Sequence, residues 1–202
     1  MERRAFIIRV TEPRESAARL NERGDALRTA AKTLGVDNFS VWNIEDLFLC
    51  YGEDGDAAAL AEKLLSAAGS GAELLCAPGT MRLMYHDIGI VRQDKSLIRH
   101  RVFATKLKPG CEEEYKRRHD RLVEARGDTV SEGPDSNFTI WYGAGYIFGY
   151  CEKVKSFDHA PTEAEKAADI AWETRQLEIM DWLTDDVDWI TGQKHDAIRR
   201  VL

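Results

Sequence analysis

Residues 38–53 read NFSVWNIEDLFLCYGE, and residues 137–152 read NFTIWYGAGYIFGYCE. Aligned without a gap, the two blocks share identical residues, which are Asn38, Phe39, Trp42, Tyr51 and Glu53 in the first and Asn137, Phe138, Trp141, Tyr150 and Glu152 in the second. Upstream, RRAFIIRV at 3–10 resembles HRVFATKL at 100–107, and a proline follows each segment closely. Similar blocks in the same order indicate an internal repeat. We therefore interpret the chain as two diverged copies of one unit, a first repeat over residues 1–91 and a second over residues 99–202.

Each repeat has the same predicted order of elements: strand, helix, two strands, helix, strand. An apolar, β-branched run opens the repeat, a helix follows the proline, and the quoted block forms two strands around a turn. The second helix is predicted over Asp56–Ala68 and Thr162–Val187, and the last strand over Met81–Ile88 and Ile198–Leu202. This order is typical of the ferredoxin-like βαββαβ unit, an α+β fold.

A four-stranded sheet with helices on one face leaves its other face without a partner. Two such repeats can cover these faces by packing sheet against sheet, as the subunits of a symmetric dimer do. We therefore predict two ferredoxin-like βαββαβ repeats packed as an intramolecular dimeric α/β barrel. A short polar linker at about Arg92–Ile98 joins the repeats.

Composition narrows the classes of function. The chain has 202 residues, 44% of them hydrophobic and 31% charged, with a formal net charge of −7. The negative charge and the scattered basic residues argue against nucleic-acid binding, and no apolar run approaches the roughly 20 residues of a membrane span. No signal peptide is visible at the N-terminus. The four cysteines are far apart and form no CxxC pair, so we expect reduced thiols in a cytoplasmic protein.

The segment LKPGCEEEYKRRHDRL, residues 107–122, contains the candidate catalytic residues. Tyr115 and His119 are four positions apart, so they share one face of the predicted helix, and Leu122 continues this face towards the sheet. An imidazole, with a free pKa near about 6.5, suits general acid or base chemistry near neutral pH. A structural, hydrogen-bonded Tyr–His pair explains the same spacing. The other histidines are isolated, so we predict no metal site.

The sequence resembles the L-rhamnose mutarotase family in the segments EEEYKRRHD, NFTIW, IFGYCE and IRRVL, which occur in this order within residues 99–202. The first repeat shares the resemblance more faintly. Members of this family fold as ferredoxin-like units that pair into dimeric α+β barrels. They interconvert the α and β anomers of L-rhamnose without a cofactor or a metal. The resemblance implies that His119 is the acid/base group and that Tyr115 is its hydrogen-bonding neighbour at the sugar.

Departures from the family pattern leave the identity of the sugar open. The family has a tryptophan–proline pair after the helix histidine, where this chain has Leu122–Glu124. The family's adjacent tryptophans in the second helix are represented here by Trp182 alone. Trp141, Trp182 and Trp189 are the candidates for an aromatic wall against the C–H face of a sugar. Core packing is the alternative role for each of them.

The first repeat has no counterpart of the catalytic histidine, because its first helix, predicted over Arg14–Leu34, contains no histidine. We expect this repeat to be a structural partner, so that the chain binds one sugar.

Together these features predict a cofactor-free mutarotase that acts on L-rhamnose or a related monosaccharide through His119. A catalytically inactive carbohydrate-binding or structural barrel protein is the alternative. A different enzyme on the same scaffold, such as a small oxygenase, rests on fold analogy alone. The expected partner is a monosaccharide rather than a nucleic acid or a membrane, and a further homodimer stays open.

Overall fold

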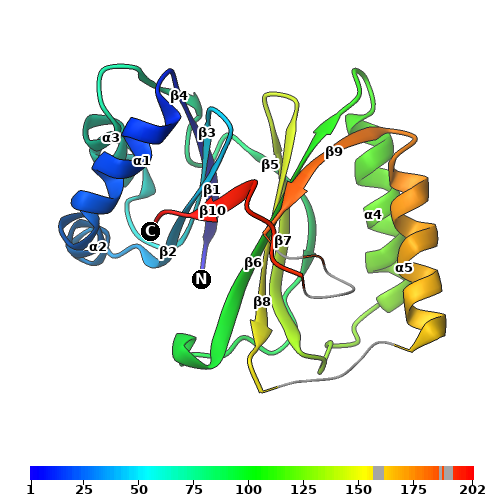
Figure 1. The fold of residues 1–202 in the computed structure, drawn as a ribbon. Helices are drawn as coiled ribbons and strands as arrows, with labels where there is room; N and C mark the ends of the chain where they lie inside the picture. The colour runs from blue at the N-terminus through cyan, green and yellow to red at the C-terminus, as the bar shows by residue number, and fades with distance from the viewer. Residues whose placement is uncertain (157–161, 187, 189–192) are drawn as a thin grey trace. The chain divides into compact units, whose positions relative to one another are not determined.

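The computed structural model describes residues 1–156, 162–186, 188 and 193–202. The chain forms two compact units, unit 1 with residues 1–82 and 196–202 and unit 2 with residues 83–195. Each unit has a five-stranded antiparallel sheet with helices, so the predicted α+β class is confirmed (Figure 1). Among the described residues, no helix is long and apolar enough to cross a membrane.

Unit 1 contains most of the first repeat and the last strand of the chain. Its elements are β1 (Arg3–Val10), α1 (Pro13–Glu22), α2 (Gly24–Thr33), β2 (Asp37–Ile44), β3 (Leu47–Glu53), α3 (Ala57–Ala68), β4 (Ala72–Cys76) and β10 (Ile198–Arg200). The strands are ordered β10-β2-β3-β1-β4. Leucines of the three helices form the apolar core with the sheet, namely Leu20, Leu27, Leu60 and Leu64. The single helix predicted over Arg14–Leu34 is wrong in detail, because it is interrupted at Arg23 and forms the two helices α1 and α2. Gly24, which disfavours helix, follows the interruption.

Unit 2 contains most of the second repeat and the last strand of the first. Its elements are β5 (Arg82–Asp87), the short 3₁₀ helix η1 (Lys95–Leu97), β6 (Ile98–Leu107), α4 (Glu112–Arg126), β7 (Asp135–Gly143), β8 (Tyr146–Val154), α5 (Glu163–Gln176) and β9 (Met180–Asp185). The strands are ordered β5-β7-β8-β6-β9. Helices α4 and α5 lie side by side over one face of this sheet (Figure 1).

The two sheets exchange their edge strands. Strand β5, at the end of the first repeat, lies beside β7 in unit 2, and β10, at the end of the second repeat, pairs with β2 in unit 1 through Ile198 and Ile44. The prediction that each of these strands completes the sheet of its own repeat is therefore wrong. Strands β4 and β9 take the fourth place instead. The compact units thus differ from the repeats 1–91 and 99–202 by one exchanged strand each.

The helix predicted over Thr162–Val187 is too long, because strand β9 occupies part of this range. Helix α5 ends at Gln176, where the backbone N–H of Ile179 donates to the Gln176 carbonyl at 2.9 Å. The chain then pairs with β6, with Asp181 opposite Lys106. This pairing provides hydrogen-bond partners for the backbone groups at the edge of β6. A helix that continued to Val187 would leave these groups without partners.

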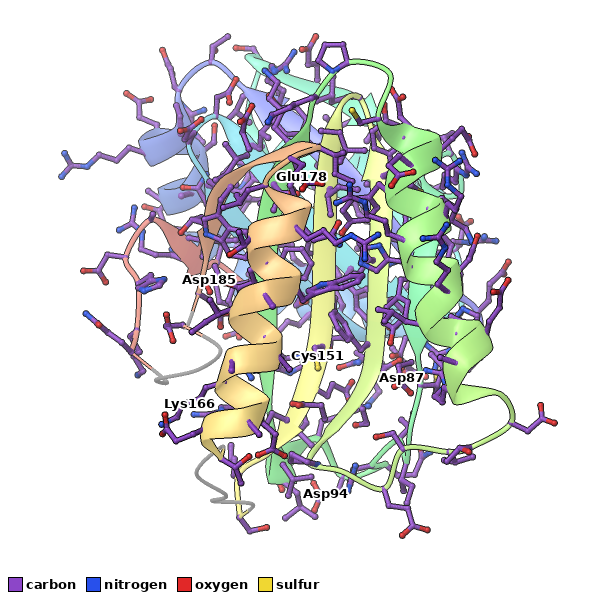
Figure 2. All side chains as sticks on the ribbon, turned by 90° about the vertical axis from the view of Figure 1, so that its right-hand side faces the viewer. Asp87, Asp94, Cys151, Lys166, Glu178 and Asp185 are labelled. Carbon is purple, nitrogen blue, oxygen red and sulfur yellow. The ribbon has the colours of Figure 1, made fainter. Side chains whose placement is uncertain are left out.

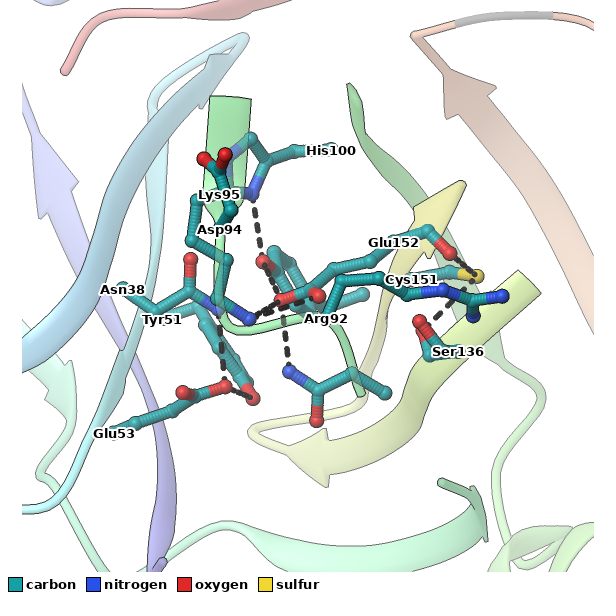
Figure 3. Close-up of polar contacts among 12 residues, drawn as sticks. Asn38, Tyr51, Glu53, Arg92, Asp94, Lys95, His100, Ser136, Cys151 and Glu152 are labelled. Carbon is teal, nitrogen blue, oxygen red and sulfur yellow. Dashed lines mark hydrogen bonds and ion pairs between the residues drawn. The ribbon is translucent and has the colours of Figure 1, made fainter. Parts of the chain in front are cut away.

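A buried carboxylate holds the start of the β2–β3 hairpin in unit 1 (Figure 3). Asn38 Nδ2 donates to Glu53 Oε1 at 3.0 Å, and the Tyr51 hydroxyl donates to the same oxygen at 2.9 Å. Asn38 has a φ of 48°, in the left-handed region, where the strand register shifts. Asparagine tolerates this backbone better than most residues do.

The same three residue types make the same contacts in unit 2 (Figure 3). Asn137 Nδ2 donates to Glu152 Oε1 at 2.9 Å, and the Tyr150 hydroxyl donates to it at 3.2 Å. Here the Lys95 ammonium from η1 adds an ion pair to the fully buried Glu152, at 2.8 Å. The recurrence of these contacts is what two copies of one ancestral unit would produce. The packing of the two sheets into a barrel stays a prediction.

The strand exchange predicts how fragments behave. A fragment of residues 97–202 lacks β5 and carries β10 without its partner β2, so we expect it to self-associate through these open edges. A fragment of residues 83–195 keeps all five strands of unit 2 and serves as the matched control. Light scattering after gel filtration should show larger species for 97–202 than for 83–195. A stable, well-folded monomer of 97–202 would contradict the exchange.

Candidate active site

A cavity of about 350 Å³ lies in unit 2, between the sheet and helices α4 and α5. Figure 2 looks onto these helices, with Cys151 of the cavity wall visible between them. The aromatic lining consists of Tyr85, Phe103, Tyr115, His119, Phe138, Trp172 and Trp182. The polar lining consists of Arg101, Asp135, Lys153, Asp169, Glu173 and Gln176. Sites for small molecules commonly have such a volume and a mainly apolar lining with a few polar groups.

Helix α4 directs His119 into the cavity. Its first turn carries acidic residues, which stabilise the positive end of the helix dipole. Its buried face presents Tyr115, Arg118 and His119. Arg118 is buried and pairs with Glu114 one turn earlier at 2.8 Å, and it also pairs with Glu178 beyond the end of α5 at 2.8 Å. These ion pairs hold the His119 turn against the end of α5.

The tautomer of His119 follows from its backbone contact. Nδ1 lies 2.9 Å from the carbonyl oxygen of Tyr115, which can only accept, so Nδ1 carries the proton. Nε2 is therefore the basic nitrogen, and none of the described residues hydrogen-bonds to it. His119 is only 4% exposed, and burial lowers its pKa to about 4. The imidazole is therefore a neutral base at neutral pH.

Tyr115 supports His119 in a way that differs from the expected side-chain hydrogen bond. The two rings stack at 4.3 Å between centroids with an interplanar angle of 27°, and the hydrogen bond runs to the Tyr115 backbone. Burial raises the pKa of the Tyr115 phenol above its usual value. The phenol therefore stays protonated and can donate a hydrogen bond.

Two further rings contact the imidazole. Trp172 of α5 meets it edge to face, with centroids 5.3 Å apart, and Tyr85 of β5 lies at 5.4 Å with a tilt of 59°. Tyr85 belongs to the first repeat, so the exchanged strand brings a residue to this site. Burial raises the pKa of the Tyr85 phenol, and the nearby Asp87 carboxylate raises it further.

The floor of the cavity depends on a glycine. Phe103 of β6 lies opposite Gly149 of β8, and a Cβ at Gly149 would collide with the Phe103 ring. The ring can therefore lie across the sheet, where it stacks on Trp182 at 5.8 Å with an interplanar angle of 12°.

The predicted tryptophans have different positions. Trp182 lines the cavity and is 41% exposed, but it lies on β9 and not on a helix. Trp141 is buried, its Nε1 donates to Thr139 Oγ1 at 3.1 Å, and it is not part of the cavity lining. Its neighbour Ile140 lines the cavity, and side chains alternate between the faces of a strand. Trp189 lies outside the described residues.

The sequence reasoning missed Trp172. Its signal was the spacing of Asp169, Trp172, Glu173 and Gln176, which share one helical face and all line the cavity. Two of these residues make the wall acidic. Burial raises the pKa of Asp169 and of Glu173, and neighbouring carboxylates raise both further.

The model of the L-rhamnose mutarotase family matches residues 100–200. The chain belongs to the L-rhamnose mutarotase family. The match includes His119, Tyr115, Trp172 and most of the cavity lining, whereas Tyr85 precedes it. Neither the search of curated proteins nor the search of solved structures gave a match. Among the described residues of this mutarotase-family chain, no group of three His, Cys, Asp or Glu side chains is placed to hold a metal ion.

The low pKa of His119 predicts a pH-dependent stability. Between pH 6.5 and 4 the unfolded histidine binds a proton that the folded one does not, so the free energy of unfolding should fall as pH falls through this window. The shift from 6.5 to about 4 corresponds to a loss of about 3 kcal/mol. Urea unfolding at pH 7 and at pH 4.5 should show a larger loss for the wild type than for His119→Gln. An equal loss in both proteins would refute the buried, neutral imidazole.

Proposed function

We propose that the cavity of unit 2 is the active site of a cofactor-free mutarotase for L-rhamnose or a related monosaccharide. One observation carries the proposal: a buried, neutral imidazole has its basic nitrogen available in a cavity sized for one small molecule. The membership of the mutarotase family supports the reaction class.

The reaction needs one proton to move in each direction. Nε2 of His119 accepts the proton of the anomeric hydroxyl while the C1–O5 bond breaks, which gives the open-chain aldehyde. The imidazolium then returns the proton to the former ring oxygen. After rotation about C1–C2, the oxygen attacks the other face of the aldehyde, and the same transfers run in reverse. A folded-state pKa of about 4 makes the imidazolium a ready acid.

The remaining lining residues suit a neutral sugar. The phenols of Tyr115 and Tyr85 are held protonated and donate hydrogen bonds to sugar oxygens as charge develops on them. Trp172 and Trp182 offer aromatic surface to the C–H face of the ring. The carboxylates of the lining, such as Asp169 and Glu173, can accept hydrogen bonds from the hydroxyl groups.

The base role of His119 predicts the pH profile of anomer exchange. The value of kcat/KM should be constant near neutral pH and should fall about tenfold per pH unit below a midpoint near 4, because protonation removes the base. His119→Gln should lower the rate by about 10²–10⁴-fold. NMR exchange spectroscopy measures the rate, with the buffer-catalysed rate subtracted. His86→Gln is the control, because His86 is exposed and not part of the cavity lining. A His119→Gln rate within a few fold of the wild type would reject the base role.

The positions of the tryptophans predict which of their substitutions change the KM for the sugar. Trp172→Leu and Trp182→Leu should each raise KM about 2- to 12-fold, because aromatic stacking contributes about 0.5–1.5 kcal/mol beyond buried area. Trp141→Phe should leave KM unchanged and lower the melting temperature, since it removes the hydrogen bond to Thr139 inside the fold. A KM raised by Trp141→Phe alone would place the sugar elsewhere.

A further inference from the structure

We infer that Gln176 binds a hydroxyl group of the sugar and sets which sugars the cavity accepts. This inference rests on the proposed function. It concerns the last residue of α5, which lines the cavity together with His119 and Trp172.

The carboxamide of Gln176 is buried without a hydrogen-bond partner. The residue is 2% exposed, and it is the buried residue of α5. Both Nε2 and Oε1 are buried, and neither makes a hydrogen bond to a described residue. An unsatisfied buried polar group costs about 1–3 kcal/mol, so an amide at this position needs a partner that the folded chain does not supply.

Core packing does not account for this residue. Methionine has the length of glutamine and would fill the same space without an unsatisfied donor and acceptor. The backbone of Gln176 is already used, because its carbonyl accepts from Ile179 N–H. The unexplained part is therefore the side-chain amide, which lies next to a cavity.

A sugar hydroxyl matches this amide. Each hydroxyl can donate to Oε1 and accept from Nε2, and the side-chain torsions of glutamine let the amide turn towards a bound ligand. Gln176 follows Trp172 by four positions, so both residues lie on one helical face. Trp172 then contacts the C–H face of the sugar, and Gln176 meets a hydroxyl at its edge. Asp135 Oδ1, also buried without a hydrogen bond, lines the same cavity and is available to another hydroxyl.

The test compares Gln176→Met with the wild type on L-rhamnose and on its monodeoxy analogues. Binding is followed by titration with NMR detection, exchange by the anomer assay, and folding by the melting temperature. We expect one analogue to bind the wild type about tenfold more weakly than L-rhamnose. Gln176→Met should bind L-rhamnose about tenfold more weakly, should no longer distinguish that analogue, and should have an equal or higher melting temperature, because it removes the unsatisfied amide. Gln93→Met is the matched control, because Gln93 is exposed and not part of the lining.

The outcomes separate this inference from the proposed function. A wild type that binds sugars without exchanging their anomers would reject the mutarotase but leave the binding role of Gln176 measurable. Exchange in the wild type with unchanged sugar discrimination in Gln176→Met would overturn the role of Gln176 alone. If Gln176→Met does not fold, Gln176→Leu, which is of similar size and has no polar group, should fold and should still lose the discrimination. Failure of both variants to fold would assign Gln176 to the core and overturn the inference.

Discussion

The open edge of the β7 strand is the constraint on which the site depends. Backbone N–H and C=O groups at a sheet edge need partners, and β5 from the first repeat supplies them. The same strand carries Tyr85 to the imidazole of His119. One lining residue of the cavity therefore comes from outside residues 99–202. Strand β5 therefore completes the edge of the sheet and also contributes an aromatic residue to the cavity.

Arg118 fixes the position of helix α5 relative to helix α4. Helix α5 buries few side chains, so apolar packing does little to fix its position. Arg118 binds Glu114 of α4, Glu178 and the backbone carbonyl of Arg175, and so joins the two helices at one end of the cavity. Trp172, one turn earlier on α5, meets His119 because of this connection. A buried guanidinium with several partners suits this role, because its planar group makes hydrogen bonds in fixed directions.

The sequence was sufficient where one local pattern decides the outcome. The repeated NF–W blocks predicted the hairpins, and the spacing of Tyr115 and His119 predicted two residues that line one cavity. The sequence was insufficient to predict a segment whose conformation or sheet depends on pairing with a strand far away in the chain. The segment Met180–Asp185 follows α5 without an intervening glycine or proline, so the local sequence does not mark the end of the helix, and only pairing with the edge of β6 selects the extended form. The position of Tyr85 depends on which of the two sheets includes β5. The local periodicity of the sequence does not predict this.

The two units differ at one matching position of their sheets. Phe6 lies opposite Cys50 in unit 1, and Phe103 lies opposite Gly149 in unit 2. Cys50 is fully buried and belongs to the apolar core of unit 1, which the leucines of its helices fill. Glycine at the matching position lets the Phe103 ring lie across the sheet, and rings and polar groups replace the leucines around the opening. Close packing favours stability, and an open, partly polar cavity gives some of it up for binding. A chain with two such units can keep a leucine-filled core in one of them and an open cavity in the other.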